Sequence, residues 1–169
     1  DFLAEHRFAL PEWATWTPAM WADCGDACRE IRDNALGWDV TDFGKGDFAR
    51  EGLTLFTLRN GNPPHDRKPY CEKIMVVREG QATPMHFHWH KMTDAECTFR
   101  LDGIETTVRA GEPFRLRPGQ SITFEPYVYH TFWAEGGDCL AGEVSTVNDD
   151  TADNRFYEPL GRYPQIDED

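Results

Sequence analysis

From Leu53 onward, hydrophobic and polar residues alternate along the chain, as they do in strands with one buried face. The apolar runs are short, and turn sequences such as Glu79-Gly80 and Asp102-Gly103 separate them. Short strands joined by glycine-containing turns are typical of an antiparallel sandwich or barrel. The predicted strands cover residues 53–58, 70–78, 97–101, 105–109, 113–116, 121–125, 130–134 and 139–145, with a further strand at 86–88.

The first forty residues have a different pattern, which predicts helices. Thr17 and Pro18 form an N-cap followed by proline at the first helical position, so a helix is expected through Trp21. A second helix is predicted over residues 26–36, with Gly37 as its C-cap. We expect one cupin domain, in which a helical extension (1–45) precedes a barrel (50–147) and a polar tail (148–169).

Charge and cysteine content narrow the class of protein. The chain has 169 residues and a formal net charge of -13, which opposes binding to nucleic acid and to anionic membranes. No apolar stretch approaches the roughly 18 residues of a membrane span. Cys24 and Cys28 are spaced to face one another on a helix, but the five cysteines contain no Cys-x2-Cys pair. Free thiols and a cytoplasmic location are therefore the expectation.

Three histidines are the candidate metal ligands. His86 and His88 are two residues apart on a predicted strand, so their side chains point to the same face. His130 lies in a later apolar run. A lone histidine is commonly a surface or core residue, but this set predicts one site for a first-row metal.

The spacing of these histidines resembles the signature of cupin barrels. Gly80 stands six residues before His86, and a Pro-Gly turn precedes His130. The chain also resembles the D-lyxose isomerase family of cupins over nearly its whole length. The sequence motifs that carry this resemblance include Tyr70-Cys-Glu-Lys73, Gly142-Glu-Val-Ser145 and residues 37–44.

The resemblance implies an all-β fold with N-terminal helices, built as a cupin-type antiparallel β-barrel (a double-stranded β-helix, or jelly roll). It also implies a homodimer that interconverts D-lyxose with D-xylulose, and D-mannose with D-fructose, with Mn(II) as cofactor. The residues that match are His86, His88 and His130 as metal ligands, Glu143 and Lys91 as catalytic groups, and Lys73, Asp153 and Arg155 as sugar-binding groups.

One ligand of the family does not transfer. The position of the family's glutamate metal ligand is occupied by Thr93 in this chain. Asp94 or Glu96 would replace that ligand only if the turn after the histidine strand had a different conformation. The stretch between His90 and Cys97 is also too short for the returning strand of a barrel. Either a deletion leaves the barrel one strand short, or residues are missing there. We favour missing residues, which predicts a break in the backbone across residues 94–96.

Because successive side chains of a strand point to opposite faces, residue spacing supports some of these roles. Lys73 shares its face with Met75 and Val77, so a buried lysine is expected, either in a structural salt bridge or at a substrate oxygen. Glu143 shares its face with Ala141, which favours an interior carboxylate over a solvated one. Lys91 is next to a turn, where a solvated lysine is nearly as plausible as a functional one.

Two other functions remain open. A three-histidine iron dioxygenase would explain the absent glutamate, but it leaves Lys73 and Glu143 without a role. A non-catalytic sugar-binding cupin would keep the pocket without the chemistry.

Overall fold

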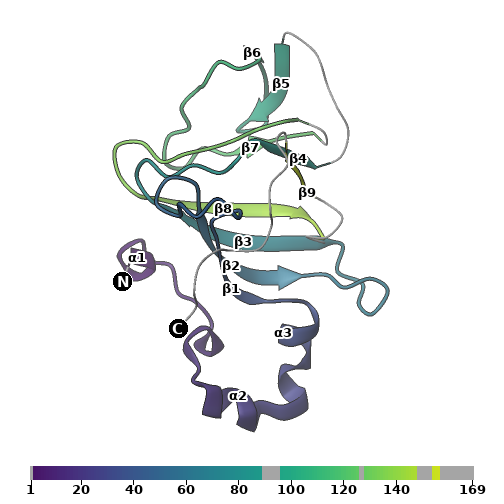
Figure 1. The fold of residues 1–169 in the computed structure, drawn as a ribbon. Coiled ribbons are helices and arrows are strands. Elements are labelled where there is room, and N and C mark those ends of the chain that lie inside the picture. Colours follow the sequence, from purple (N-terminus) through teal and green to yellow (C-terminus); the bar gives the residue numbers. More distant parts are fainter. Residues whose placement is uncertain (1, 89–95, 126–127, 148–153, 157–169) are drawn as a thin grey trace. The chain divides into compact units, whose positions relative to one another are not determined.

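The computed structural model describes residues 2–88, 96–125, 128–147 and 154–156 (Figure 1). Contacts along the chain divide these residues into two compact units. The first unit contains residues 2–84 and 132–147, and the second contains residues 85–88, 96–125, 128–131 and 154–156. The single cupin domain expected from the sequence stays a prediction.

The first unit is built on a four-stranded antiparallel sheet, with strand order β1-β2-β3-β8 (Figure 1). The strands are β1 (Gly37–Thr41), β2 (Leu53–Asn60), β3 (Tyr70–Val77) and β8 (Cys139–Thr146). Three of them match predicted strands. The exception is β1, because Gly37 begins a strand instead of capping a helix. Its φ of +119° is a conformation that glycine adopts without strain.

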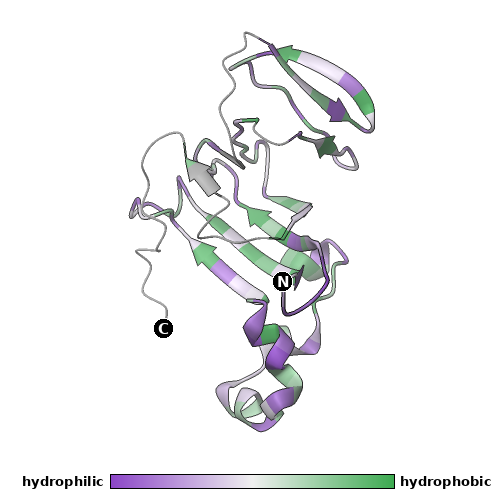
Figure 2. Ribbon diagram, turned by 90° about the vertical axis from the view of Figure 1, so that its right-hand side faces the viewer, coloured by the Kyte–Doolittle hydropathy of each residue, from purple (hydrophilic) through white to green (hydrophobic). Residues whose placement is uncertain are grey.

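The two faces of this sheet bury different residues. On one face, Leu55 and Met75 are cross-strand neighbours and belong to a core cluster that includes Ala134. Ala141, the partner of Met75 on β8, is partly buried and packs against this cluster. On the other face, the Phe56 ring has an exposed fraction of 0% and packs against aromatic rings from the N-terminal segment. Figure 2 colours much of the sheet as hydrophobic, as burial on both faces requires.

Short helices precede the sheet. They are α1 (Phe2–Glu5), η1 (Glu12–Thr15), α2 (Pro18–Cys24), η2 (Gly25–Cys28) and α3 (Arg29–Asp33). The predicted start of α2 is confirmed, since the Thr17 hydroxyl accepts a hydrogen bond from the Met20 amide at 3.4 Å. The second predicted helix was too long and too regular. It ends three residues early, before Ala35, whose φ of +51° is left-handed.

The second unit contains two small antiparallel sheets. One pairs β4 (His86–His88) with β9 (Asn154–Phe156), and the other has the order β6-β5-β7. In the second sheet, β5 (Glu96–Leu101) and β6 (Ile104–Arg109) form the predicted hairpin, and β7 (Ile122–Thr123) adds a short third strand. Asp102 and Gly103 both have positive φ, as a type I′ turn needs. Hydrophobic and hydrophilic residues alternate along the hairpin (Figure 2).

Two predicted strands are wrong. Residues 113–116 form no strand, because Pro113 lacks an amide hydrogen for a strand ladder. Residues 130–134 form only isolated bridges, because they lie opposite the irregular segment 79–86. The tail prediction also missed β9, which pairs with the histidine strand. The mostly β composition is confirmed, and the closed barrel remains a prediction.

The cysteine prediction needs a correction. Cys24 and Cys28 form a disulfide, because the helical turn between them brings their Cα atoms to 5.9 Å, a separation that a disulfide can span. Cys71, Cys97 and Cys139 form no disulfide, as expected. Within the described residues, no helix has the length and apolar character needed to cross a membrane. The predicted break at residues 94–96 lies largely outside the described chain.

Candidate functional site

His86 and His130 lie beside one another in the second unit. The two residues form an isolated antiparallel bridge, in which each backbone amide donates to the other residue's carbonyl, at 3.0 and 2.9 Å. Their imidazole ring centroids are 4.5 Å apart. Rings this close are able to bind one metal ion with metal–nitrogen bonds of about 2.1 Å. The structure therefore brings together two of the three predicted ligands, which are 44 positions apart in the chain.

The ring of His130 is held by two further contacts. Its Nδ1 lies 2.9 Å from the carbonyl oxygen of Val128, and since a carbonyl only accepts, Nδ1 carries the hydrogen. This tautomer leaves Nε2 as the nitrogen with a lone pair, as in metal-binding histidines whose other nitrogen is tied to an oxygen. The Phe124 ring stacks on the imidazole, with centroids 4.5 Å apart and planes at 16°.

His88 is placed only by its backbone. It is two residues after His86 on β4, and its Cα is opposite that of Asn154 on β9. No group of three histidine, cysteine, aspartate or glutamate side chains forms a metal cluster in the part of the chain that the structure describes. The described side chains that fit a metal are thus the two imidazoles of His86 and His130, with His88 predicted to complete the set.

Lys73 and Glu143 form a cross-strand pair in the first unit. They are direct partners on β3 and β8, and the lysine Nζ is 3.8 Å from the glutamate Oε1. The lysine side chain is 12% exposed and the glutamate side chain 36%. At 3.8 Å the contact is an ion pair and not a hydrogen bond. Both residues share the sheet face of Met75 and Ala141, and the ion pair fits a structural role as well as a catalytic one.

Thr57, which the sequence did not single out, extends this polar row. It is the direct partner of Lys73 on β2, and it is buried with an exposed fraction of 6%. Thr57, Lys73 and Glu143 therefore share one level of the sheet, next to the apolar row of Leu55 and Met75. A buried hydroxyl beside a partly buried lysine is a polar feature of an otherwise hydrophobic face.

The remaining predicted site residues are not described in full. Lys91 and Asp153 lie outside the described residues, as do Thr93 and Asp94. Arg155 is placed by its backbone alone, opposite Phe87. Glu96 is described at the start of β5, where it is exposed and its strand partner is Arg109.

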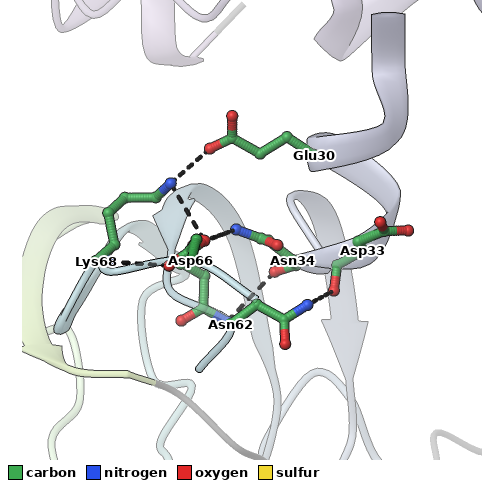
Figure 3. Close-up of polar contacts among 7 residues, drawn as sticks. Glu30, Asp33, Asn34, Asn62, Asp66 and Lys68 are labelled. Atoms are coloured by element: carbon green, nitrogen blue, oxygen red, sulfur yellow. Dashed lines mark hydrogen bonds and ion pairs between the residues drawn. The ribbon is translucent and has the colours of Figure 1, made fainter. Parts of the chain in front are cut away.

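A second polar cluster lies between α3 and the segment that follows β2 (Figure 3). The Lys68 ammonium is 2.6 Å from the Glu30 carboxylate and 3.4 Å from Asp66. The amide of Asn34 donates to Asp66 at 2.6 Å. Desolvation alone would raise the pKa of Asp66, but hydrogen bonds from the backbone amides of Lys68 and Asn62 and from the Asn34 and Lys68 side chains outweigh it and lower the pKa to about 2.

The sequence contained little sign of this cluster. Its members come from two segments about thirty residues apart, and each is a polar residue of a kind common on surfaces. Hydrogen bonding to Glu30 raises the pKa of Lys68, so the lysine is a cation throughout the neutral range.

Comparison with known proteins identifies relatives over the whole chain. The model of the D-lyxose isomerase family matches residues 1–97 and 93–169. The D-lyxose/D-mannose isomerase of Serratia proteamaculans is 48% identical, with 99% of this chain and 86% of that protein aligned. The enzyme of the same name from Escherichia coli O157:H7 is 46% identical, with 100% of this chain and 87% of that protein aligned.

Among solved structures, the L-ribose isomerase of Cellulomonas parahominis with L-ribose has a TM-score of 0.45 and 17% identity. The match covers 89% of this chain and 92% of that one. The sequence matches are far stronger, and they make the protein a sugar isomerase. More narrowly, the chain belongs to the D-lyxose isomerase family, because the family model and both bacterial relatives match nearly all of it.

The matches also locate a difference from the family. The family model matches in two pieces that meet at residues 93–97. The alignments extend over 198 and 199 residues, whereas this chain has 169. The relatives therefore contain residues with no counterpart here, and the junction falls where the sequence predicted a gap in the barrel.

Proposed function

We propose that this protein is a divalent-metal-dependent aldose–ketose isomerase that interconverts D-lyxose with D-xylulose, and D-mannose with D-fructose. The observation that carries this proposal is the near full-length match to two bacterial D-lyxose/D-mannose isomerases. The polar row on the sheet and the histidine pair are the groups that we assign to the reaction.

The metal ligands in this proposal are His86, His88 and His130. Support comes from the adjacent rings of His86 and His130 and from the hydrogen bond that fixes the His130 tautomer. Mn(II) is the expected ion, since the family resemblance implies it. When bound, the ion would act as a Lewis acid that stabilises negative charge on sugar oxygens.

Proton transfer is assigned to Glu143. Its carboxylate would take the proton from C2 of the aldose while O1 gains a proton, which gives an enediol with a double bond between C1 and C2. Return of the proton to C1, with loss of the O2 proton, gives the ketose. The ammonium of Lys73, which is 3.8 Å from Glu143, donates to a sugar oxygen.

Lys91 is proposed as a second catalytic group, and Asp153 and Arg155 as sugar-binding groups, all from the family resemblance. A closed cupin barrel, a homodimer and a cytoplasmic location remain part of the proposal.

The test is turnover by the purified protein with added Mn(II), with product sugars measured in the presence and absence of oxygen. Glu143→Gln should retain metal and lower kcat by roughly 10²-fold or more, as removal of a general base does. A matched control is Glu105→Gln, which removes an exposed carboxylate on β6. Unchanged kcat in Glu143→Gln would remove Glu143 from the mechanism. Oxygen consumption without isomerisation would favour an iron dioxygenase, and sugar binding without turnover would favour a non-catalytic cupin.

A further inference from the structure

A pocket of about 440 Å³ lies in the first unit, apart from the residues assigned above. Its walls come from the N-terminal segment, from η2 and α3, and from the ends of β2 and β3. Small-molecule sites in proteins have volumes of roughly 300–1,000 Å³ and combine apolar walls with a few polar groups. This pocket has both, since Trp13 and Tyr70 line it together with Glu30, Arg59 and Lys68.

The pocket is separate from the candidate isomerisation residues. The Trp13 ring packs on Phe56 with centroids 5.0 Å apart, so the pocket lies on the Phe56 face of the sheet. Successive residues of a strand point to opposite faces. Tyr70 is three residues from Lys73 along β3, and its side chain therefore points away from the face that carries Lys73 and Glu143.

The charges at the pocket are paired with one another. The Lys68 ammonium is 2.6 Å from Glu30 and 3.4 Å from Asp66. Figure 3 shows both contacts. Arg59 forms an ion pair with Glu72 on the neighbouring strand. A charged ligand would have to compete with these partners, whereas a neutral one would not.

Hydrogen-bonding capacity remains after this pairing. An ammonium has three hydrogens, and the two contacts of Lys68 use two of them. The Glu30 contact is made by Oε1, which leaves a second carboxylate oxygen, and the guanidinium of Arg59 has five hydrogens. Donors and acceptors placed side by side next to aromatic rings match vicinal hydroxyl groups on a carbon frame.

We propose that this pocket binds an uncharged polyhydroxylated ligand of monosaccharide size. The site requires no metal and none of the catalytic groups. It is independent of the proposed function, since a sugar could bind here whether or not the protein isomerises it.

The experiment follows the indole N–H resonance of Trp13 by ¹H–¹⁵N NMR of the full chain. Trp13→Phe assigns the signal among the six tryptophans. The probe is methyl α-D-mannoside, whose blocked anomeric carbon prevents isomerisation. We expect a saturable shift with a millimolar Kd, and weaker shifts with D-glucuronate and D-glucosamine, which carry opposite charges.

Two surface substitutions form a matched pair. Ala27 is exposed and lines the pocket, so Ala27→Phe should fill it and abolish the shift. Ala22 is exposed on α2 and does not line the pocket, so Ala22→Phe should leave the shift unchanged. Tyr70→Ser gives an independent test, because it removes a pocket ring from a residue that is 37% exposed.

The proposal is overturned if the Trp13 resonance does not move with the mannoside, or if Ala27→Phe and Tyr70→Ser both retain the full shift. A larger shift with D-glucuronate than with the mannoside would make the pocket an anion site and would also overturn it.

Discussion

The variant Lys73→Met tests whether the Lys73–Glu143 ion pair is structural or catalytic. The substitution keeps the length and apolar stem of the side chain and removes its charge. Glu143, the cross-strand partner at 3.8 Å, then loses a neighbouring cation. If the pair only supports the sheet, stability should fall and turnover of the folded protein should not. If Lys73 acts on the sugar, turnover should fall far more than stability.

The two effects differ in size. Unit charges about 4 Å apart attract by about 1 kcal/mol in water and about 4 kcal/mol at an effective dielectric of about 20. Because the Glu143 side chain is 36% exposed, the lower part of that range applies. Removing the lysine also removes its desolvation cost, so a net loss of at most about 1 kcal/mol is expected, or roughly 2–4 °C in Tm for a chain of this size. Loss of a catalytic group lowers kcat by about 10²-fold or more.

The assay is kcat/KM for D-lyxose with Mn(II), together with thermal unfolding of the same preparations. Lys73→Met, Glu143→Gln and the double variant form a double-mutant cycle. We expect turnover losses that are strongly non-additive and stability losses that are small. A variant that loses several degrees of Tm but keeps its kcat/KM would refute the reasoning and leave Lys73 as a structural residue.

Three further predictions concern other contacts. Phe124→Leu removes the ring stacked on His130 and should lower the affinity for Mn(II) by about 10–100-fold, as loss of a contact that supports a metal ligand does. Calorimetric titration would measure the affinity, and an unchanged value would count against the metal site. Asp66→Asn should reduce the pH dependence of the free energy of unfolding, which urea unfolding at pH 6 and pH 3 would measure. The pKa of Asp66 is about 2 in the folded protein and higher in the unfolded chain, so the carboxylate stabilises the fold above about pH 4 and this stabilisation is lost as the pH falls toward 2. Gly61→Ala should prevent soluble expression, because a Cβ would lie 2.0 Å from the backbone oxygen of Lys68; normal expression and melting would contradict the close packing.

Local signals predicted the elements that depend on local chemistry. The Thr17-Pro18 pair located the start of α2, and Asp102-Gly103 located the β5–β6 hairpin, because capping and turn conformations are properties of a few adjacent residues. The alternation of side chains along a strand also predicted that Lys73 shares a sheet face with Met75, and Glu143 with Ala141. Parity alone did not show that they are direct partners, since register is set by distant parts of the sheet.

The errors share a non-local cause. Gly37 is of a residue type that commonly ends a helix, but its segment pairs with β2 and forms a strand. The apolar run at His130 predicted a strand, yet its neighbours at 79–86 offer only single bridges. The contact between His86 and Phe156 comes from β9, in a tail whose polarity predicted no pairing. The Phe124 stacking on His130 had no signal beyond the aromatic content of that segment.

The backbone bridge between His86 and His130 has a consequence for substitutions near the two histidines. Two reciprocal hydrogen bonds hold these residues opposite one another, and they involve only main-chain atoms. The opposed placement of the two imidazoles therefore does not depend on the identity of the side chains around them. Substitutions near the bridge change the shape and polarity of the surroundings and leave the two histidines opposite one another.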